Sequence, residues 1–370
     1  MSAESLPFIP PAKPIVGDDE RAAVDRVMRS GMIAQGPEVA AFEQEFGAAV
    51  AGGRTTVAVN SGTSALHLGL LAAGIGPGDE VIVPSFTFAA TANSVALTGA
   101  TPVFADVEPD YFCLDADSVR AAVTDRTAAI MPVHLYGHPA DVDALRAVAD
   151  EHGLRLFEDA AQAHLATWKG AQVGSFGDFA MFSLYPTKNM TSGEGGMVSC
   201  ATEEIARMVR LLRNQGMERQ YANEVVGFNA RMTDIHAAIG RVQLTKVEGW
   251  TKVRQENAAY LDAHLEGVVV PPVADDATHV YHQYTIKVDG DERDRIVTAM
   301  REEHQVGSGV YYPIPNHQLA SLTRYAEGLE LPVTQQVARE VISLPVHPSL
   351  DEAALERIVT AVNTTVRAGA

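Results

Sequence analysis

The sequence predicts an α/β protein that is built around a mainly parallel sheet. From about residue 55, short apolar runs rich in β-branched residues alternate with helical stretches. The runs IVP, PVF and RLF lack the alternation of apolar and polar residues that marks a half-exposed strand, so we expect both faces of these strands to be buried. Strands separated by helices need right-handed crossovers, which place the strands parallel in one sheet.

The expected elements of this sheet follow one another along the chain. The run TTVAV (55–59) predicts a strand, and a helical run extends from Ser64 to Ala73. The turn residues Gly-Pro-Gly-Asp at 76–79 then lead into the next strand. Further strands are expected at 80–86, 101–107, 127–133 and 154–159, with helices at 89–97 and 141–152.

The second part of the chain differs in character after the segment GFNARMTD (227–234). One long helix is expected from Asp234 to Leu265, because apolar residues recur at helical spacing. These residues are Ile235, Ala238, Ile239, Val242 and Val247. Such a length suggests a connector that leaves a large domain.

A smaller α+β domain is expected after this connector. The run 281–288 predicts a strand and the run 291–304 a helix, and Ser349 with Glu352 forms a capping box that opens a terminal helix. A chain of 370 residues also exceeds one small core. We therefore predict a large domain over 1–248, with an N-terminal arm, and a small domain over 249–370.

Composition excludes several classes of protein. With 46% apolar and 20% charged residues, the chain reads as globular. Lysine and arginine total 28 against 47 acids, a net charge of −19 without any basic cluster, which argues against a nucleic-acid partner. The two cysteines, Cys113 and Cys200, support neither a disulfide framework nor a zinc site.

The expected location is the cytoplasm. No apolar run approaches the ~18 residues of a membrane span, so no membrane partner is expected. The N-terminal residues also lack the features of a signal peptide.

The segment Ser61-Gly62-Thr63-Ser64 lies between a predicted strand and a predicted helix. Backbone N–H groups at a helix N-terminus, together with the helix dipole, can hold a phosphate. Ser and Thr are also the favoured residues of an ordinary N-cap, and for this segment alone that interpretation is the better one. The nucleotide-binding patterns G-x-G-x-x-G and G-x-x-x-x-G-K-[ST] are both missing from the sequence.

Two charged residues, Asp159 and Lys188, are candidates for chemistry. Asp159 ends the run LRLFED, at the carboxyl edge of the sheet, where it could hold a protonated ring nitrogen or a metal. A helix-capping role is equally compatible with this residue alone.

Lys188 lies in FSLYPTKNMTSGEGGMV, whose apolar and glycine-rich flanks suggest partial burial. Burial lowers the pKa of a lysine and makes it a nucleophile, although a lone loop lysine is more commonly a solvated surface charge.

Together these features are compatible with pyridoxal phosphate (PLP). This cofactor needs a lysine for its aldehyde, a carboxylate for its ring nitrogen, a phosphate cradle and an aromatic ring against one face. Phe88, in PSFTFAAT, is a candidate for that ring, although by itself it reads as a core phenylalanine. Ser183 could donate a hydrogen bond to the phosphate. No resident metal is expected.

Blocks of sequence along nearly the whole chain resemble the DegT/DnrJ/EryC1/StrS aminotransferases, which are PLP enzymes that make amino sugars. The blocks are NSGTSALHLGLLAAGIGPGDEVIVPSFTFAATANSV, GATPVFADV, LFEDAAQAH, GSFGDFAMFSLYPTKNMTSGEGGMV, GFNARMTDIHAAIGRVQL and VYYPIPNHQL. The resemblance implies the PLP-dependent transferase fold of type I, which is the aspartate aminotransferase-like fold.

The resemblance also implies roles for particular residues. Lys188 would bind PLP covalently, Asp159 would pair with the ring nitrogen, and Gln162 would bind the ring hydroxyl. The phosphate would be held by Gly62, Thr63, Ser64 and Ser183, and the ring would stack on Phe88. Asn229 resembles a residue that the partner subunit supplies to the phosphate, so a homodimer with shared active sites is implied. His317 and Tyr311 resemble residues of a sugar pocket. For His164, catalysis and simple packing are equally weighted.

The implied reaction moves an amino group from L-glutamate, or less commonly glutamine, to a keto group of a nucleotide-linked sugar. Lys188 distinguishes the chain from the sugar 3-dehydratases of this family, which carry a histidine there. SGEGGM resembles enzymes of 4-keto-6-deoxy sugars, such as perosamine synthases, whereas EDAAQAH and YPTKN resemble enzymes of 3-keto sugars, so the carbon stays open. Two alternatives remain: an aminotransferase for a cyclitol or other non-nucleotide ketone, and a binding or regulatory protein that keeps the fold without turnover.

Overall fold

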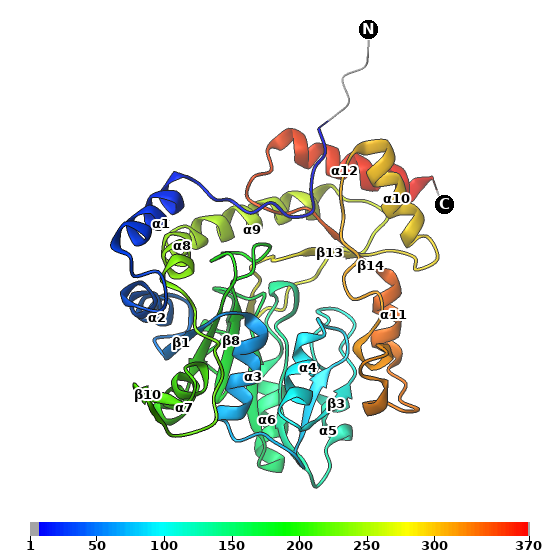
Figure 1. The fold of residues 1–370 in the computed structure, drawn as a ribbon. Coiled ribbons are helices and arrows are strands. Elements are labelled where there is room, and N and C mark those ends of the chain that lie inside the picture. The colour runs from blue at the N-terminus through cyan, green and yellow to red at the C-terminus, as the bar shows by residue number, and fades with distance from the viewer. Residues whose placement is uncertain (1–6, 369–370) are drawn as a thin grey trace.

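The computed structural model describes residues 7–368, which form an α/β fold around one seven-stranded sheet (Figure 1). The strand order is β1-β9-β8-β5-β4-β2-β3. Within this sheet β9 pairs antiparallel with both β1 and β8, and the other strand pairs are parallel. The predicted α/β class and mainly parallel sheet are therefore confirmed. The strands are β1 (Thr55–Val59), β2 (Glu80–Pro84), β3 (Thr101–Ala105), β4 (Thr127–Ile130), β5 (Arg155–Asp159), β8 (Phe179–Ser183) and β9 (Gly196–Cys200).

Both faces of the sheet are covered, as the continuous apolar runs predict. Along β2, Val81 and Val83 join one hydrophobic cluster while Ile82 joins another, because successive side chains point to opposite faces. The first cluster includes residues of α3 (Gly62–Ala72), α4 (Ala90–Leu97) and α7 (Glu203–Arg213). The second includes residues of α5 (Ala116–Ala122) and α6 (Val142–His152).

An N-terminal group of helices packs beside β1. The group comprises α1 (Asp18–Ser30), α2 (Pro37–Val50) and α8 (Asp234–Leu244). The buried Asp234 carboxylate accepts hydrogen bonds from the backbone N–H groups of Gly36, Glu38 and Val39, and so caps α2 from α8. Small additional sheets are formed by β6 (Thr167–Trp168), β7 (Ala171–Gln172) and β12 (Ala277–Thr278), and by β10 (Met217–Arg219) with β11 (Ala222–Asn223).

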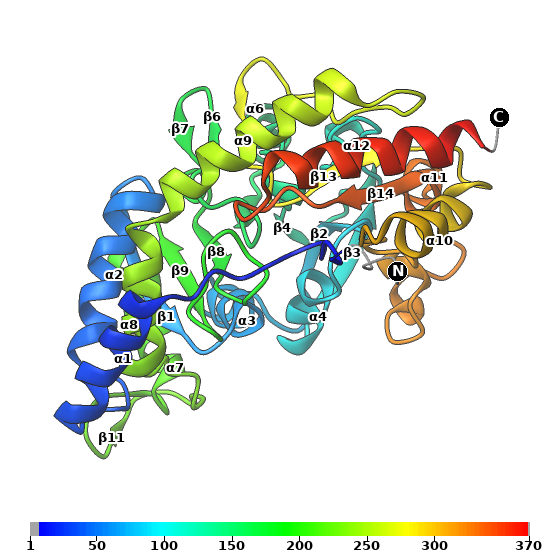
Figure 2. The same ribbon diagram turned by 90° about the horizontal axis from the view of Figure 1, so that it is seen from above.

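The single long helix expected from Asp234 to Leu265 is wrong, because the structure has two helices there. The first helix, α8, ends at Leu244, and α9 spans Val247–His264. Thr245 and Lys246 donate backbone hydrogen bonds only three residues back, to Val242 and Gln243, which ends the first helix in a tight turn. The first helix packs on α1 and α2 whereas α9 packs on α12, so the chain changes direction (Figure 2).

The C-terminal part has its own hydrophobic cluster, formed by residues of α9, α10 (Arg293–His304), α12 (Glu352–Arg367) and the antiparallel pair β13 (Tyr284–Lys287) and β14 (Val341–Leu344). Not all of 249–370 belongs to it, because Val337 and Ala338 of α11 (Pro332–Glu340) pack into the core of the large sheet. The domain boundary at residue 248 stays a prediction. None of the described helices is both long and apolar enough to cross a membrane.

The N-terminal arm connects these parts of the molecule (Figure 2). Ile9 forms a parallel bridge with Val306 and is buried in the C-terminal cluster. Further along, the carbonyl of Ile15 accepts a hydrogen bond from Gln243 Nε2 at 2.8 Å. The arm therefore spans from the C-terminal cluster to the helices beside β1.

The capping box expected at Ser349 and Glu352 is wrong, because the terminal helix starts later. Asp351 is the N-cap of α12, and its Oδ1 accepts a hydrogen bond from the backbone N–H of Ala354 at 2.9 Å. Ser349 and Asp351 are both exposed, so burial does not distinguish them as caps. Asp351 is the cap because the first helical residue is Glu352.

Replacing Asp351 with alanine is expected to lower the free energy of unfolding by about 1 kcal/mol, because the first turn loses its side-chain acceptor. Urea unfolding followed by circular dichroism measures the change. Ser349→Ala is the matched control and should leave stability close to wild type. A larger loss in Ser349→Ala than in Asp351→Ala would contradict this assignment of the cap.

Candidate active site

A cavity of about 330 Å³ opens at the carboxyl edge of β5 and β8, next to the start of α3. This volume lies in the range of small-molecule sites, about 300–1,000 Å³. The cavity brings together residues that are far apart in the sequence. It is lined by Ser61, Gly62, Thr63, Thr87, Phe88, Ala90, Thr91, Val133, Tyr136, Asp159, Ala161, Gln162, Met181, Ser183, Tyr185, Thr187, Lys188, Glu194, His282, Gln283, Tyr311 and Tyr312.

The start of α3 forms one end of the cavity. Ser61 is the N-cap, and its Oγ accepts a hydrogen bond from the backbone N–H of Ser64 at 3.1 Å. Ser61, Gly62 and Thr63 line the cavity, whereas Ser64 lies outside its lining. The backbone at Gly62 closely approaches Ser183, because a Cβ at Gly62 would lie 3.0 Å from the Ser183 Cβ. A helix N-terminus with hydroxyl groups beside it fits a phosphate group.

Asp159 is a buried carboxylate on the cavity wall, with 4% of its surface exposed. It accepts hydrogen bonds from Thr91 Oγ1 at 2.8 Å and from the backbone N–H of Ala161 at 3.1 Å. Burial raises its pKa, and these hydrogen bonds together with the nearby Lys188 oppose the shift. Asp159 has no ion-pair partner within 4.0 Å in the described part of the chain. The carboxylate therefore fits a cationic ligand atom such as a protonated ring nitrogen.

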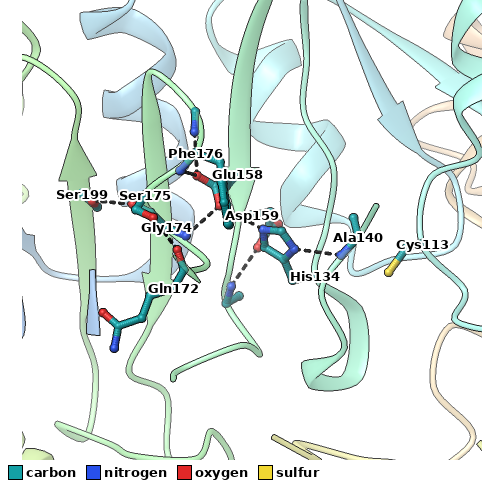
Figure 3. A network of polar contacts seen from close by, with 12 residues as sticks. Cys113, His134, Ala140, Glu158, Asp159, Gln172, Gly174, Ser175, Phe176 and Ser199 are labelled. Carbon is teal, nitrogen blue, oxygen red and sulfur yellow. Dashed lines mark hydrogen bonds and ion pairs between the residues drawn. The ribbon is translucent and has the colours of Figure 1, made fainter. Parts of the chain in front are cut away.

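The preceding residue, Glu158, points to the other side of β5 and has a structural role (Figure 3). Its carboxylate accepts backbone hydrogen bonds from Gly174, Phe176 and Gly177 at 2.6–2.8 Å. It also pairs with His134 Nε2 at 3.1 Å. Burial disfavours the charged form of Glu158, but the bonds from His134 and the backbone outweigh burial and lower its pKa. Glu158 therefore anchors the loop before β8, and Asp159 is left to face the cavity.

Lys188 lies in the loop between β8 and β9, where it is partly buried against the cavity. Within residues 7–368 its Nζ has no hydrogen-bond or ion-pair partner. Burial lowers its pKa to about 8, although Asp159 acts in the opposite direction. A useful fraction of the amine is therefore neutral near physiological pH, which is the form that attacks a carbonyl.

Gln162 is fixed on the cavity wall by two residues that the sequence analysis did not select. Its Oε1 accepts a hydrogen bond from the backbone N–H of Tyr136 at 2.6 Å, and its Nε2 donates to Tyr312 Oη at 2.9 Å. The rings of Tyr136 and Tyr312 stack with 12° between their planes. Both tyrosines have left-handed backbones, with φ of 56° and 59°, a strain that is found mainly at functional sites.

Phe88 and Tyr311 line the cavity as well. Phe88 is 63% exposed, so its ring is a surface of the cavity and not part of the core. Burial raises the pKa of Tyr311, and a hydrogen bond with Gln283 opposes the shift. Both residues are thus placed where a bound ligand can touch them.

The remaining residues selected from the sequence lie outside the lining of the cavity. His164 is fully buried between Phe46 and Phe182, and neither ring nitrogen has a hydrogen-bond partner in the described structure. His317 is held by Ser85, whose Oγ lies 2.7 Å from its Nδ1. Asn229 is exposed. The geometry therefore favours packing for His164, and the roles of His317 and Asn229 stay predictions.

Other residues of the lining were missed because no local pattern marks them. Thr91 is one of several small polar residues on α4, and only the fold shows that it donates to Asp159. Tyr312 stands next to Tyr311 in VYYPIPNHQL, which is the one available signal. The other polar or aromatic ones are Thr87, Tyr136, Tyr185, Thr187, Glu194, His282 and Gln283. In the described residues no group of three or more His, Cys, Asp or Glu side chains could hold a metal ion.

A buried carboxylate, a lysine of lowered pKa and a helix N-terminus at one edge of a mainly parallel sheet define a fold type I enzyme of the PLP-dependent class. The model of the DegT/DnrJ/EryC1/StrS aminotransferase family matches residues 14–363, and the chain belongs to this family. The predicted family, fold class, enzyme class and cofactor are confirmed.

Named relatives span almost the whole chain. A UDP-N-acetyl-3-dehydro-alpha-D-glucosamine 3-aminotransferase of Acidithiobacillus ferrooxidans is 40% identical and covers 94% of both chains. GDP-perosamine synthase of Caulobacter vibrioides is 40% identical, covering 97% of this chain and 98% of the relative. The crystal structure of NtdA from Bacillus subtilis with bound cofactor PMP, the aminated form of PLP, is 29% identical with a TM-score of 0.90, covering 99% of this chain and 86% of that one.

Proposed function

We propose that this protein moves an amino group from L-glutamate to a keto group of a nucleotide-linked sugar, with PLP bound covalently to Lys188. The observation that carries the proposal is the single cavity that joins Lys188, Asp159 and the start of α3. The names of the two sugar-modifying relatives support a nucleotide sugar as the acceptor. A cyclitol or another non-nucleotide ketone remains the alternative acceptor.

The described residues fit the cofactor. Asp159 would hold the protonated ring nitrogen, Gln162 the ring hydroxyl, and Phe88 one face of the ring. The phosphate would be bound at the start of α3 by Gly62, Thr63 and Ser183, which line the cavity, with Ser64 as the next residue of the helix. When bound, PLP supplies an electron sink for charge that develops on the reacting carbon. Because Asp159 is buried, its negative charge acts strongly on a cationic nitrogen and stabilises it there.

Lys188 would move the proton in this reaction. The pKa of about 8 leaves the amine able to take up a proton near neutral pH and to release it again, which is the requirement for a general base that later acts as an acid. Once free, its Nζ would remove the α-proton of the amino donor. In the second half of the reaction it would return a proton to the carbon that carried the keto group.

We further propose a cytoplasmic homodimer in which Asn229 reaches the phosphate of the partner's site and His317 with Tyr311 contacts the sugar. The support for a dimer is the exposed apolar surface next to Asn229, where Val226 is 92% and Phe228 41% exposed. Phe88 at the cavity is also widely exposed. Exposed apolar side chains that gather on a surface are typical of a face that another chain covers.

Addition of L-glutamate to the PLP-loaded protein is expected to bleach its visible absorbance, because the amine of Lys188 would be released and the absorbing bond between Lys188 and PLP would be lost. The absorbance should then return on addition of an accepted keto compound. A panel with 3-keto and 4-keto nucleotide sugars and a keto cyclitol identifies the acceptor and the carbon. Absence of bleaching with glutamate, glutamine or any other amino donor would favour a binding or regulatory protein.

A further inference from the structure

Asn189, the residue after Lys188, ties the lysine loop to the segment before β13. Asn189 is 4% exposed, and its Nδ2 donates to the carbonyl of Val280 at 3.1 Å. Since a carbonyl can only accept, this bond fixes the orientation of the amide, and Oδ1 faces His282 Nδ1 at 3.2 Å. The ring nitrogen must therefore be the donor, so Nδ1 of His282 carries the proton.

The other nitrogen of His282 is free to act at the cavity. His282 lines the same cavity as Lys188, and its Nε2 has no hydrogen-bond partner among residues 7–368. Burial lowers the pKa of His282 far below its usual value, and the nearby cations Lys188 and Arg254 act in the same direction. The ring is therefore neutral, and with Nδ1 protonated its Nε2 offers a lone pair and no hydrogen.

The amine of Lys188 needs an acceptor of this kind when the cofactor does not hold it. An ammonium group has three donors, and a buried donor without a partner is costly. Asp159 is the anion whose charge raises the pKa of Lys188. It already accepts hydrogen bonds from Thr91 and Ala161, and it would hold the ring nitrogen of the cofactor. A neutral imidazole adds no charge that would compete for this carboxylate.

We infer that His282 is a positioning residue whose Nε2 accepts a hydrogen bond from the amine of Lys188 when the lysine side chain turns toward it across the shared cavity, and that Asn189 sets the tautomer this requires. The inference deepens the proposed function and rests on Lys188 being the reactive amine. The contact holds the released amine in the cavity between the two halves of the reaction. The titratable and charged groups around Lys188 and His282 are Asp159, His164, Glu194, Arg254, His279 and Tyr312.

The test is the pH dependence with which the apoprotein takes up PLP at Lys188. The bond is trapped with borohydride, and the modified peptide is quantified by mass spectrometry. The wild-type midpoint is expected near pH 8. In His282→Leu the ammonium form loses its acceptor, so the pKa of Lys188 falls and the midpoint moves down by about one pH unit. The variant His282→Gln keeps a carbonyl acceptor and should keep the wild-type midpoint.

Two results would overturn the role of His282: an unmoved midpoint in His282→Leu, or an equal shift in His282→Gln with both variants folded by circular dichroism. A measurement on the wild-type apoprotein covers the case in which His282→Leu does not fold. Nitrogen NMR of ¹⁵N-labelled histidine should show the proton of His282 on Nδ1, and a proton on Nε2 would exclude the contact. If PLP is trapped on a lysine other than Lys188, the proposed function fails instead, whatever the variants show.

Discussion

Replacing Lys188 with alanine is expected to lower kcat by about 10⁴-fold or more, because the chain loses both its nucleophile and its general base. The variant should also lose the visible absorbance of covalently bound PLP after desalting. Lys188→Arg keeps the positive charge but not the nucleophilic amine, and we expect a similar loss. Single-turnover assays with glutamate measure the first half of the reaction and absorbance spectra the cofactor.

Lys169→Ala is the matched control for this experiment. Lys169 is an exposed lysine that pairs with Asp143 and Asp276, and none of these three residues lines the cavity. Its loss should leave the rate and the spectrum close to wild type. Turnover in Lys188→Ala above a few percent of the wild-type value would show that another group performs the proton transfer.

Replacing Asp159 with asparagine is expected to have the second largest effect, a fall in kcat of about 10²- to 10³-fold. Asparagine cannot neutralise a positive ring nitrogen, and breaking a buried pair of charges costs about 3–5 kcal/mol. The ring nitrogen should then lose its proton at a lower pH. The measurement is kcat together with a pH titration of the absorbance of the bound cofactor.

Glu158→Gln separates this role from a general effect of losing a buried acid in β5. Glu158 accepts four hydrogen bonds on the opposite face of the strand, and a glutamine has only one acceptor oxygen for them. We expect a lower melting temperature, while the spectrum of the bound cofactor stays close to wild type. Equal spectral effects in both variants would argue against a direct contact of Asp159 with the ring.

The sequence predicted the central sheet well because its strands are buried on both faces. A short continuous apolar run such as that of β2 has few secondary-structure assignments other than a buried strand once Gly and Pro mark its ends. It did not predict the break at Thr245 or the cap at Asp351. The apolar spacing continues across the break, and the two helices separate only because they pack on different partners. Several residues near 350 could cap a helix, and packing selects among them.

Site residues were predicted where a local pattern carries them, as for Lys188 between glycine-rich and apolar flanks. Thr91, Tyr136 and His282 have no such pattern. Each is defined by a contact with a distant segment: Thr91 with Asp159, Tyr136 with Gln162, and His282 with Asn189. These contacts join residues that are 26 to 93 positions apart in the chain, so only the folded arrangement reveals them.

The bond between Asn189 and His282, 93 residues apart, has a consequence for biosynthesis on the ribosome. Tyr312, still further along the chain, also belongs to the cavity wall. Contacts of such long range form late, since loop closure must precede them. A nascent chain that has not yet emerged beyond this tyrosine lacks a finished cavity. PLP would therefore bind only after translation has nearly ended. By binding the folded state and not the unfolded chain, it would then stabilise the finished protein.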